Sequence, residues 1–534
     1  MFSRVAWMGL ALLCCLPFTA SAQPFAPNWP PHVIETAESF EAEDKIVGTH
    51  YFYWYDYPHH HFFDNAERTD DALQDHFPNP ESVSYNSTAW HRKQIDDCMA
   101  AGLDFIMPVY WGVVDNYFRP GLIFSVQGLG PLQRALEERQ AEGLDAPKIG
   151  LFYDTSTLLP GIRGERGRSE KYDLTTPEGQ DIFYRTIRDF FHQVHPRHWA
   201  MIDGQPLVVL YGSGFAKSHG QSTFDYVVEQ FQEDFHGLKP YIVRDASWNA
   251  QTDAVTAWGA ALGGPNIYDT VAQIGPGYND MAVPGRSTPI RDREGGNYYR
   301  WSWNQVLDSS ANIVLIETWN EMHEGTTICE TVEYGRQYIE LTRLYVDRFK
   351  QGLPAPNEIT LRHPNPLPRP ASDEGQEYAD QQSVSIDFTR SEPSEGIWLV
   401  RGQPDGPVRS GAWGGQSAIR TAEADTTYMY FNIADPFAFD LDETVTVRYT
   451  YWDDGYNSHL LEYDSNDASA TLNGAYTATP PVQCEQSGEW VTRTVTLEDA
   501  RFVNRQNGGS DLRFAVRGGW LAIRDLAVVK KTAP

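Results

Sequence analysis

The chain of 534 residues is poor in long apolar runs, in cysteine and in basic residues. Beyond its N-terminal segment no stretch of about eighteen apolar residues occurs, which excludes a polytopic membrane protein. Five cysteines, without the spacing of a structural zinc site, exclude a disulfide-rich scaffold. Lys and Arg number 42 against 72 Asp and Glu, giving a net charge of -30, so nucleic acid is not an expected partner.

The first 22 residues predict a secretory signal. Arg4 supplies a positive start, residues 5–17 are an apolar run too short to span a bilayer, and Ala20-Ser21-Ala22 offers a cleavage site. We therefore expect a secreted or periplasmic protein that is not inserted in a membrane. The mature chain then keeps three cysteines, enough for at most one disulfide: Cys98, Cys329 and Cys484.

Strand-like and helix-like pieces alternate over residues 45–350. Short apolar runs suit buried parallel strands and occur at 45–54, 103–109, 148–153, 206–211, 240–243 and 312–319, with weaker candidates at 255–260 and 265–274. Helical patterns lie at 90–101, 131–143, 179–194, 224–235 and 330–350. This α/β alternation predicts a TIM-like (β/α)8 barrel. A doubly wound open sheet is the alternative, although no Gly-rich phosphate loop follows a strand.

The C-terminal part has a different pattern. Residues 354–382 are rich in Pro, Asn, Asp and Glu and predict a linker. From residue 383 short alternating strands, without a convincing helix, predict an all-β, jelly-roll-like sandwich. The expected organisation is a signal peptide at 1–22, a catalytic barrel at 23–353, a linker at 354–382 and a sandwich at 383–534.

The predicted sandwich is rich in aromatic residues. It is a candidate carbohydrate-binding module, and a purely structural domain with these aromatics in its core is an equal alternative: Trp398, Trp413, Tyr451, Trp452, Tyr456, Trp490 and Trp520.

Active residues of a barrel lie at the carboxyl ends of its strands. The predicted strands end in aromatic, histidine and carboxylate side chains that suit a sugar-binding cleft: His50, Trp54, Tyr55, Tyr110, Trp111, Asp154, Tyr211 and Asp245. Sugar rings present apolar faces that stack on Trp and Tyr, of which the chain has 16 and 28. Packing in the core is the alternative explanation of these aromatics.

Two acids after the last predicted strand are the candidate catalytic pair. Glycoside cleavage uses one carboxyl group to protonate the leaving oxygen and a second as base or nucleophile. On a helical turn Glu321 and Glu324 would share one face, and their proximity would raise the pKa of one of them. By spacing alone, however, the acidic first turn of a helix is the better explanation.

Four motifs in order favour catalysis instead. The segment Trp319-Asn320-Glu321-Met322-His323-Glu324-Gly325-Thr326 resembles the N-E-W-H-E-G-T signature of glycoside hydrolase family 99, the endo-α-mannosidase and mannanase family. Three upstream pieces are similar to further segments of that family: His50 to Tyr55, Ala101 to Phe105 with Tyr110-Trp111-Gly112, and Pro276 to Asp280 with Arg293 and Gly296 to Tyr299. The resemblance spans about residues 45–350.

This resemblance implies a retaining glycosidase. In the family's proposed mechanism the substrate's own 2-hydroxyl is the nucleophile and a 1,2-anhydro sugar forms. Glu321 would be the base that assists O2, and Glu324 the acid/base at the leaving oxygen. Tyr278, Asn320 and His323 would join the substrate-binding set.

Departures from the family pattern imply another sugar specificity. Met322 stands where the family has Trp, and Asp154 stands where a Glu-containing segment is expected. We therefore expect a distant relative that acts on another polysaccharide or oligosaccharide.

Other readings of the site stay open. Asp154 and Asp245, at different strand ends, are a competing catalytic pair. A non-catalytic glycan-binding protein is a second hypothesis, and a polysaccharide esterase or lyase a third, although the chain has no G-x-S-x-G elbow.

No cofactor or metal is expected at the site. The adjacent histidines 59–61 cannot easily face one ion. A structural calcium in the C-terminal domain, at Asp464, Asn466 and Asp467, is an option that an acidic turn explains equally well.

Overall fold

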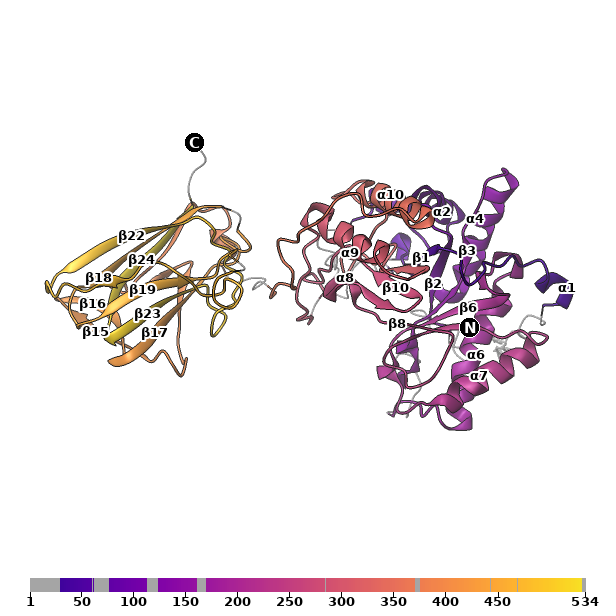
Figure 1. Ribbon diagram of the computed structural model, residues 1–534, viewed down its shortest axis with the longest axis horizontal. Helices are drawn as coiled ribbons and strands as arrows, with labels where there is room; N and C mark the ends of the chain where they lie inside the picture. Colours follow the sequence, from indigo (N-terminus) through magenta and orange to yellow (C-terminus); the bar gives the residue numbers. More distant parts are fainter. Residues whose placement is uncertain are drawn as a thin grey trace, which may run out of the picture.

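The structure is a computed structural model that describes residues 29–59, 61, 76–112, 123–160, 170–283, 285–369, 375–441, 443–467 and 469–530. The predicted signal, 1–22, and His60 lie outside these residues. Figure 1 shows two bodies, one of α/β elements up to α10 and one of strands from β12 onward. In the part of the chain that is described, no helix is long and apolar enough to cross a membrane.

One mostly parallel sheet forms the centre of the α/β region. Its strand order is β8-β7-β6-β4-β2-β1-β11-β10, and each of these neighbouring pairs is parallel. The strands are β1 (Ile46–Tyr51), β2 (Phe105–Tyr110), β4 (Leu151–Tyr153), β6 (Gln205–Leu210), β7 (Tyr241–Asp245), β8 (Ala254–Thr256), β10 (Val271–Ile274) and β11 (Ile313–Ile316). Parallel β3 (Lys148–Ile149) adds to β2, and antiparallel β5 (Met201–Ile202) and β9 (Asn266–Tyr268) add to β6 and β10.

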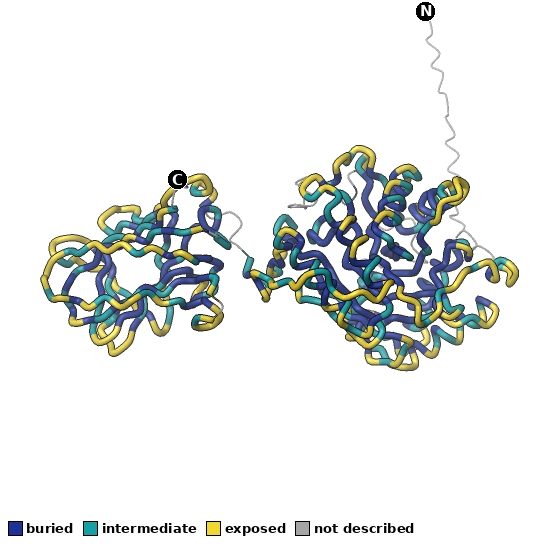
Figure 2. The backbone as a smooth tube through the Cα atoms, turned by 45° about the horizontal axis from the view of Figure 1, so that its top comes forward, coloured by how far each residue is buried: buried dark blue, intermediate teal, exposed yellow. Residues whose placement is uncertain are grey.

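The two end strands of this parallel set approach each other. The hydroxyl of Thr256 in β8 donates a hydrogen bond to the side-chain oxygen of Gln273 in β10. β1, β2, β10 and β11 are buried along their whole length, as their apolar runs predict for parallel strands covered on both faces. Figure 2 shows this buried interior beneath an exposed rim.

Helices connect most of these strands. They are α1 (Pro31–Ile34), α2 (Thr88–Ala101), α3 (Phe124–Gln127), α4 (Leu129–Ala141), α6 (Pro177–Gln193), α7 (Gln221–Asp234), α8 (Ala260–Gly263), α9 (Asn297–Leu307) and α10 (Gln337–Gln351). Short 3-10 turns are η1 (Tyr57–His59), η2 (Pro80–Ser82), η3 (Thr155–Leu158), η4 (Pro196–His198), η5 (Ser213–Phe215), η6 (Glu294–Gly296) and η7 (Gln376–Tyr378). α2 begins where Ser87 Oγ accepts the N–H of Trp90, at 3.2 Å.

The helices differ from the predicted ones in two places. The helix predicted from residue 330 begins only at Gln337, because Thr331 and Gly335 pair in a closed turn that leaves Tyr334 outside the helix. α9 was not predicted, since its Asn and aromatic residues are modest helix formers. Tyr299, Trp303 and Val306 are nevertheless buried at helical spacing. Residues 246–253, between β7 and β8, contain no helix.

Two antiparallel sheets form the C-terminal region. The first contains β12 (Ser383–Asp387), β13 (Ser394–Glu395), β15 (Val408–Trp413), β16 (Gln416–Thr421), β18 (Val445–Trp452), β22 (Trp490–Leu497) and β24 (Ala522–Lys530). The second contains β14 (Ile397–Val400), β17 (Ala424–Ile433), β19 (Ser458–Tyr463), β20 (Thr477–Ala478), β21 (Val482–Gln483) and β23 (Leu512–Gly519). One core joins them, in which the rings of Tyr449 and Phe514 lie 4.8 Å apart.

Part of the predicted linker packs against both regions. Leu367 pairs with Ile290 through two backbone hydrogen bonds of 2.9 and 2.7 Å. Arg369 Nη1 donates to Asp280 Oδ1 at 3.1 Å, and Arg362 Nη2 donates to the carbonyl of Leu441 at 2.6 Å. Residues 362–369 are therefore fixed to the α/β region, and Arg362 also reaches the β region.

Gly48 makes the close packing of β1 on β2 possible. A Cβ at this position would lie 2.1 Å from a ring carbon of Phe105. We expect Gly48→Ala to lower the free energy of unfolding by about 1–3 kcal/mol through overpacking. Gly130→Ala in α4 is the control, because its Cβ meets only the tip of Arg134 at 3.4 Å and alanine favours a helix. Thermal melting measures both; equal melting temperatures would contradict this packing argument.

Candidate active site

The segment after β11 is tied to the end of β1. The side-chain oxygen of Asn320 accepts the N–H of Phe52 at 2.8 Å, and its amide nitrogen donates to the carbonyl of Phe52 at 2.7 Å. The hydroxyl of Tyr55 donates to the carbonyl of Asn320 at 3.1 Å and accepts the N–H of Met322 at 3.0 Å. These bonds fix the backbone on both sides of Glu321.

Glu321 and Glu324 lie in a turn and not at the start of a helix. Residues 322–325 form the turn, and α10 begins only at Gln337, so the helix-start explanation is wrong. Gly325 adopts a φ of 59°, a left-handed conformation that favours glycine. The N–H of Asn279 donates to the carbonyl of Glu324 at 2.8 Å and holds the turn from the other side.

Glu321 is buried with one oxygen bonded and one left over. Its Oε1 accepts the N–H of His323 at 3.1 Å, and the ring Nδ1 of His323 lies 3.4 Å from the same oxygen. Its Oε2 is buried and has no hydrogen-bond partner among the described residues. One oxygen of Glu321 is thus held by the protein, and the other can accept a proton from a substrate hydroxyl.

Glu324 has the surroundings of an acid. Burial raises its pKa to about 8, the charge of Glu321 acts in the same direction, and the guanidinium of Arg286 opposes them. Arg286 Nη1 lies 3.6 Å from Glu324 Oε1. At neutral pH the carboxyl group of Glu324 is therefore mostly protonated. The two acids differ in environment as an acid and a base at one site should.

Asp280 organises the charges next to Glu324. It is buried, its Oδ2 accepts the hydroxyl of Tyr278 at 3.0 Å, and its Oδ1 accepts Arg369. Arg286 lies 3.7 Å from the same carboxylate and so spans Asp280 and Glu324. Burial first, and then the charge of Glu324, raise the pKa of Tyr278. Tyr278 thus lies close to the proposed acid.

Aromatic rings form one wall of the site. Phe152 and Trp258 stack at 5.4 Å with an interplanar angle of 10°, and Tyr211 meets Trp258 edge-on at 5.2 Å. Burial raises the pKa of Tyr211, and the charge of Glu324 acts in the same direction. His50 meets Trp258 at 4.9 Å. Burial lowers the pKa of His50 to about 4, and its neutral ring donates from Nδ1 to the carbonyl of Ile316 at 3.0 Å.

Glu317 fixes the loop that carries Trp258. Its carboxylate accepts the N–H groups of Gly259 at 2.9 Å and Ala261 at 3.1 Å, and the amide of Gln273. Burial raises the pKa of Glu317 to about 7. Trp258 and Arg286 were not among the predicted site residues. Trp258 falls inside the weak strand candidate at 255–260, whereas the observed strand β8 ends at Thr256 and leaves Trp258 in the loop that follows.

Trp54, Trp111 and Asp154 form a second group beside Glu321. The indole N–H of Trp111 donates to Asp154, whose other oxygen accepts the N–H of Ser156 at 3.0 Å. The rings of Trp54 and Trp111 meet edge-on at 5.6 Å. Burial raises the pKa of Asp154, and the charge of Glu321 adds to this shift. The structure thus brings these three predicted residues toward the carboxylate pair.

Two predicted residues are engaged elsewhere. The hydroxyl of Tyr110 donates to Asp189 and accepts the amide of Gln193 at 2.7 Å, both in α6 on the outer side of the sheet. Both oxygens of Asp245 accept backbone N–H groups, those of Ser247 and Trp258, each at 2.9 Å. We leave Tyr110 and Asp245 out of the site proposed below. Because Asp245 is engaged by backbone N–H groups, the structure favours Glu321 and Glu324 over the alternative pair of Asp154 and Asp245.

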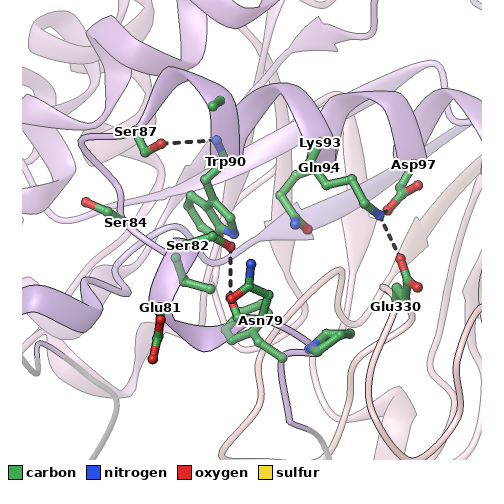
Figure 3. Close-up of a pocket in the computed structure, with 14 residues that line it drawn as sticks. Asn79, Glu81, Ser82, Ser84, Ser87, Trp90, Lys93, Gln94, Asp97 and Glu330 are labelled. Carbon is green, nitrogen blue, oxygen red and sulfur yellow. Dashed lines mark hydrogen bonds and ion pairs between the residues drawn. The ribbon is translucent and has the colours of Figure 1, made fainter.

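A pocket of about 550 Å³ lies outside this site, next to α2. Figure 3 shows Trp90 pointing toward Asn79 across it, with the ion pair of Lys93 and Glu330 at one side. No predicted site residue lines the pocket. Gln94 lines the pocket and accepts the indole N–H of Trp319 at 2.7 Å. Trp319 therefore lies between the pocket and the turn that carries Glu321 and Glu324, which we call the carboxylate turn.

The described residues contain no cluster of three or more His, Cys, Asp and Glu that could hold a metal ion. Asp464, one of the predicted calcium ligands, is buried and pairs with Arg505 at 2.8 Å, and its other oxygen accepts the N–H of Val503 at 3.0 Å. This carboxylate serves packing within the β region.

The fold and the site define an α/β protein with paired carboxyl groups at the carboxyl ends of parallel strands. The family described as "Domain of unknown function (DUF5010)" matches residues 34–362, more than half of the chain, and the chain belongs to this family. The match ends within the segment 362–369 that packs on the α/β region.

Part of the chain is similar to curated proteins named as glycoprotein endo-alpha-1,2-mannosidases or as proteins like them. The glycoprotein endo-alpha-1,2-mannosidase-like protein of Homo sapiens is 35% identical over 78 residues, 14% of this chain and 16% of that protein. The like-named protein of Danio rerio is 31% identical over 96 residues, 15% and 22%. The chain thus spans less than a quarter of the length of the curated relatives it matches. The solved GH99 endo-alpha-mannosidase of Bacteroides thetaiotaomicron is 18% identical, with a TM-score of 0.43 over 58% of this chain and 98% of that one.

Two substitutions next to Glu324 should shift its pKa in opposite directions. Glu321→Gln removes a negative neighbour and should lower the pKa of Glu324; Arg286→Gln removes a positive neighbour and should raise it. The carboxyl carbon resonance of Glu324, titrated by NMR and assigned by its loss in Glu324→Gln, measures both shifts. Arg343→Gln on the surface of α10 is the control and should leave it unchanged. Shifts of the same sign in both variants would contradict the arrangement.

Proposed function

We propose that the chain is an exported retaining glycoside hydrolase whose α/β region is a (β/α)8 barrel, with Glu321 and Glu324 as its catalytic carboxyl groups. The observation that carries this proposal is the carboxylate turn. One acid is held by a backbone N–H, and the other is kept protonated by burial beside it. The distant relatives named as endo-alpha-1,2-mannosidases support the reaction class.

The barrel part of the proposal rests on the strand order. Eight parallel positions run from β8 to β10 within the described residues, and the contact of Thr256 with Gln273 joins the two ends. Closure would place Glu321, Glu324, Asp154 and Tyr211 around one mouth, as barrel enzymes arrange their active residues.

In the first step, Glu324 gives its proton to the glycosidic oxygen as the bond from this oxygen to the anomeric carbon breaks. The 2-hydroxyl of the same sugar attacks the anomeric carbon and loses its proton to Glu321, so a 1,2-anhydro sugar forms. The family resemblance suggests this internal nucleophile, and the environments of the two carboxyl groups agree with the direction of both proton transfers.

In the second step, water opens the three-membered ring at the anomeric carbon and gives a proton to the ionised Glu324. O2 regains its proton from Glu321. Both carboxyl groups return to their starting state, and the product keeps the anomeric configuration of the substrate.

The aromatic wall favours a pyranose ring beside Glu324. Trp258 and Tyr211 are partly exposed and can stack on an apolar sugar face, while Tyr278 and His323 carry polar groups near the two acids. Met322, buried behind the turn, replaces the family's Trp, so we propose a glycan other than the mannosides named for the relatives.

The variants Glu321→Gln and Glu324→Gln test the assignment. Each should lower kcat on a polysaccharide by about a hundredfold or more, because each removes one proton-transfer group. On an aryl glycoside, whose leaving group needs no acid, Glu324→Gln should regain the first step, measured as an initial release of the phenol, and Glu321→Gln should not. Reducing ends and anomeric configuration, followed by NMR over a panel of polysaccharides, give the measurement.

The same assay separates the alternatives. Near-normal turnover in both glutamine variants, with loss in Asp154→Asn, would show the assignment to be wrong. Inversion of configuration would exclude the mechanism above, and an unsaturated sugar end would indicate a lyase. A chain that binds but never cleaves any glycan would be a binding protein.

The pH dependence follows from the direction of the Glu324 shift. The acid acts only when protonated, so kcat should fall as the pH rises through about 8. In Glu321→Gln the residual activity should fall at a lower pH, because the pKa of Glu324 is then lower. A high-pH limb that does not move would argue against Glu324 as the acid.

Export by residues 1–22 is part of the proposal. N-terminal sequencing of the protein recovered outside the cytoplasm should begin at Gln23, after the Ala20-Ser21-Ala22 site.

A further inference from the structure

Three tryptophan residues of the β region pack closely against glycine backbone. A Cβ on Gly411 would lie 2.5 Å from the ring of Trp413, one on Gly414 would lie 2.2 Å from the ring of Trp452, and one on Gly455 would lie 2.6–2.8 Å from Trp520. No side chain can stand between these rings and the backbone. All three residues are only partly buried, so each keeps some surface accessible to solvent.

These rings belong to one cluster at one end of the first antiparallel sheet. Trp413 and Trp520 lie 6.2 Å apart, and Trp452 and Trp490 face each other across β18 and β22 at 5.3 Å. Alternation along β18 places Tyr451 in the core and Trp452 on the outer face. We call the outer surface of these four tryptophans the tryptophan face.

Arginine side chains line the tryptophan face. Arg420 lies 4.4 Å over the ring of Trp520, and Arg524 lies 5.5 Å over that of Trp490. Arg524 is braced by Asp525 at 2.8 Å and by the side-chain oxygen of Gln416 at 2.9 Å. Such guanidinium groups are held in place before any ligand arrives.

Two of the arginines are direct cross-strand neighbours. Arg409 in β15 pairs in register with Arg420 in β16, and like charges at such positions destabilise a sheet. Arg409 is exposed, and the acidic group nearest to Arg420 is the exposed Glu423 at 3.7 Å. In a chain of net charge -30 this pair costs stability unless an anion binds beside it.

The tryptophan face is far from the joint with the α/β region. Arg362 and His363 contact Asp440 and Leu441, just before β18 begins at Val445, and Trp452 ends the same strand about 25 Å away. In Figure 1 the ends of β15, β16 and β18 project away from the α/β body. A polymer could therefore lie on this face without meeting the carboxylate turn.

We propose that the tryptophan face binds a polysaccharide that carries carboxylate or sulfate groups. Flat rings at Trp413 and Trp520 stack on sugar faces, and Arg409 and Arg420 pair with the anionic substituent through charged hydrogen bonds. This proposal rests on the proposed function only in taking the bound polymer to be the substrate of the α/β region. Binding itself requires no turnover.

Affinity electrophoresis of the full chain tests this proposal. The chain carries Glu324→Gln so that the polymer in the gel stays intact. Polygalacturonate and dextran sulfate supply the two anionic groups, and hydroxyethylcellulose is the neutral polymer. We expect retardation by at least one anionic polymer, weaker in high salt, and none by the neutral one.

Matched variants locate the binding surface. The pair Arg409→Gln/Arg420→Gln, and separately Trp413→Ala, should weaken binding by about tenfold. Gly411→Val, which keeps Trp413 but lifts its ring, should do the same. The pair Arg390→Gln/Arg401→Gln removes equal charge outside the tryptophan face and should bind normally. Thermal melting checks that each variant folds.

The proposal would be overturned if only the neutral polymer retarded the chain, or if no polymer did. It would also be overturned if both arginine double variants lost binding equally. A dimer that Trp413→Ala dissociates, without polymer binding, would assign the face to a second copy instead. Anionic-polymer binding together with turnover unchanged by Glu321→Gln and Glu324→Gln would overturn the proposed function and leave this inference intact.

Discussion

The amide side chain of Asn320 is the interaction on which the site depends. It takes the place of a neighbouring strand, bonding both backbone groups of Phe52, while Tyr55 bonds the backbone on either side of Glu321. An amide can do this because it carries a donor and an acceptor in one plane, and a carboxylate of the same shape cannot. Asn320 thus links the end of β1 to the turn that carries Glu321 and Glu324, and we assign Asn320 no direct contact with substrate.

Burial of acidic groups is the second constraint. Three acidic residues near the site are almost fully buried: Glu317, Glu321 and Asp280. Each carboxylate is held by hydrogen bonds or by an arginine. Among the described residues, Glu324 has no close hydrogen-bond donor for its carboxyl group, and Arg286 stays 3.6 Å away. A carboxyl group so placed is most stable with its proton. Two chemically identical side chains, those of Glu321 and Glu324, therefore lie in different environments.

The sequence allowed the α/β class and the positions of most strands along the chain to be predicted, because continuous apolar runs are local signals. It did not predict α9, whose aromatic residues have weak helix propensity and gain their stability from burial. It also could not show that Tyr110 and Asp245 are engaged by α6 and by backbone N–H groups, since residues at a strand end alternate between two faces. Arg286 and Trp258 come from loops that carry no periodic signal.

Arg369 connects the segment between the two regions to the charged residues around Glu324. Arg369 bonds Asp280, Asp280 also attracts Arg286, and Arg286 opposes the proton on Glu324. A residue beyond the matched family region thus belongs to the charge network of the acid. The two regions are therefore not interchangeable parts. Replacing the β region from residue 353 onward would remove Arg369 from the charge network around Glu324, whereas a junction after Arg369 would keep it.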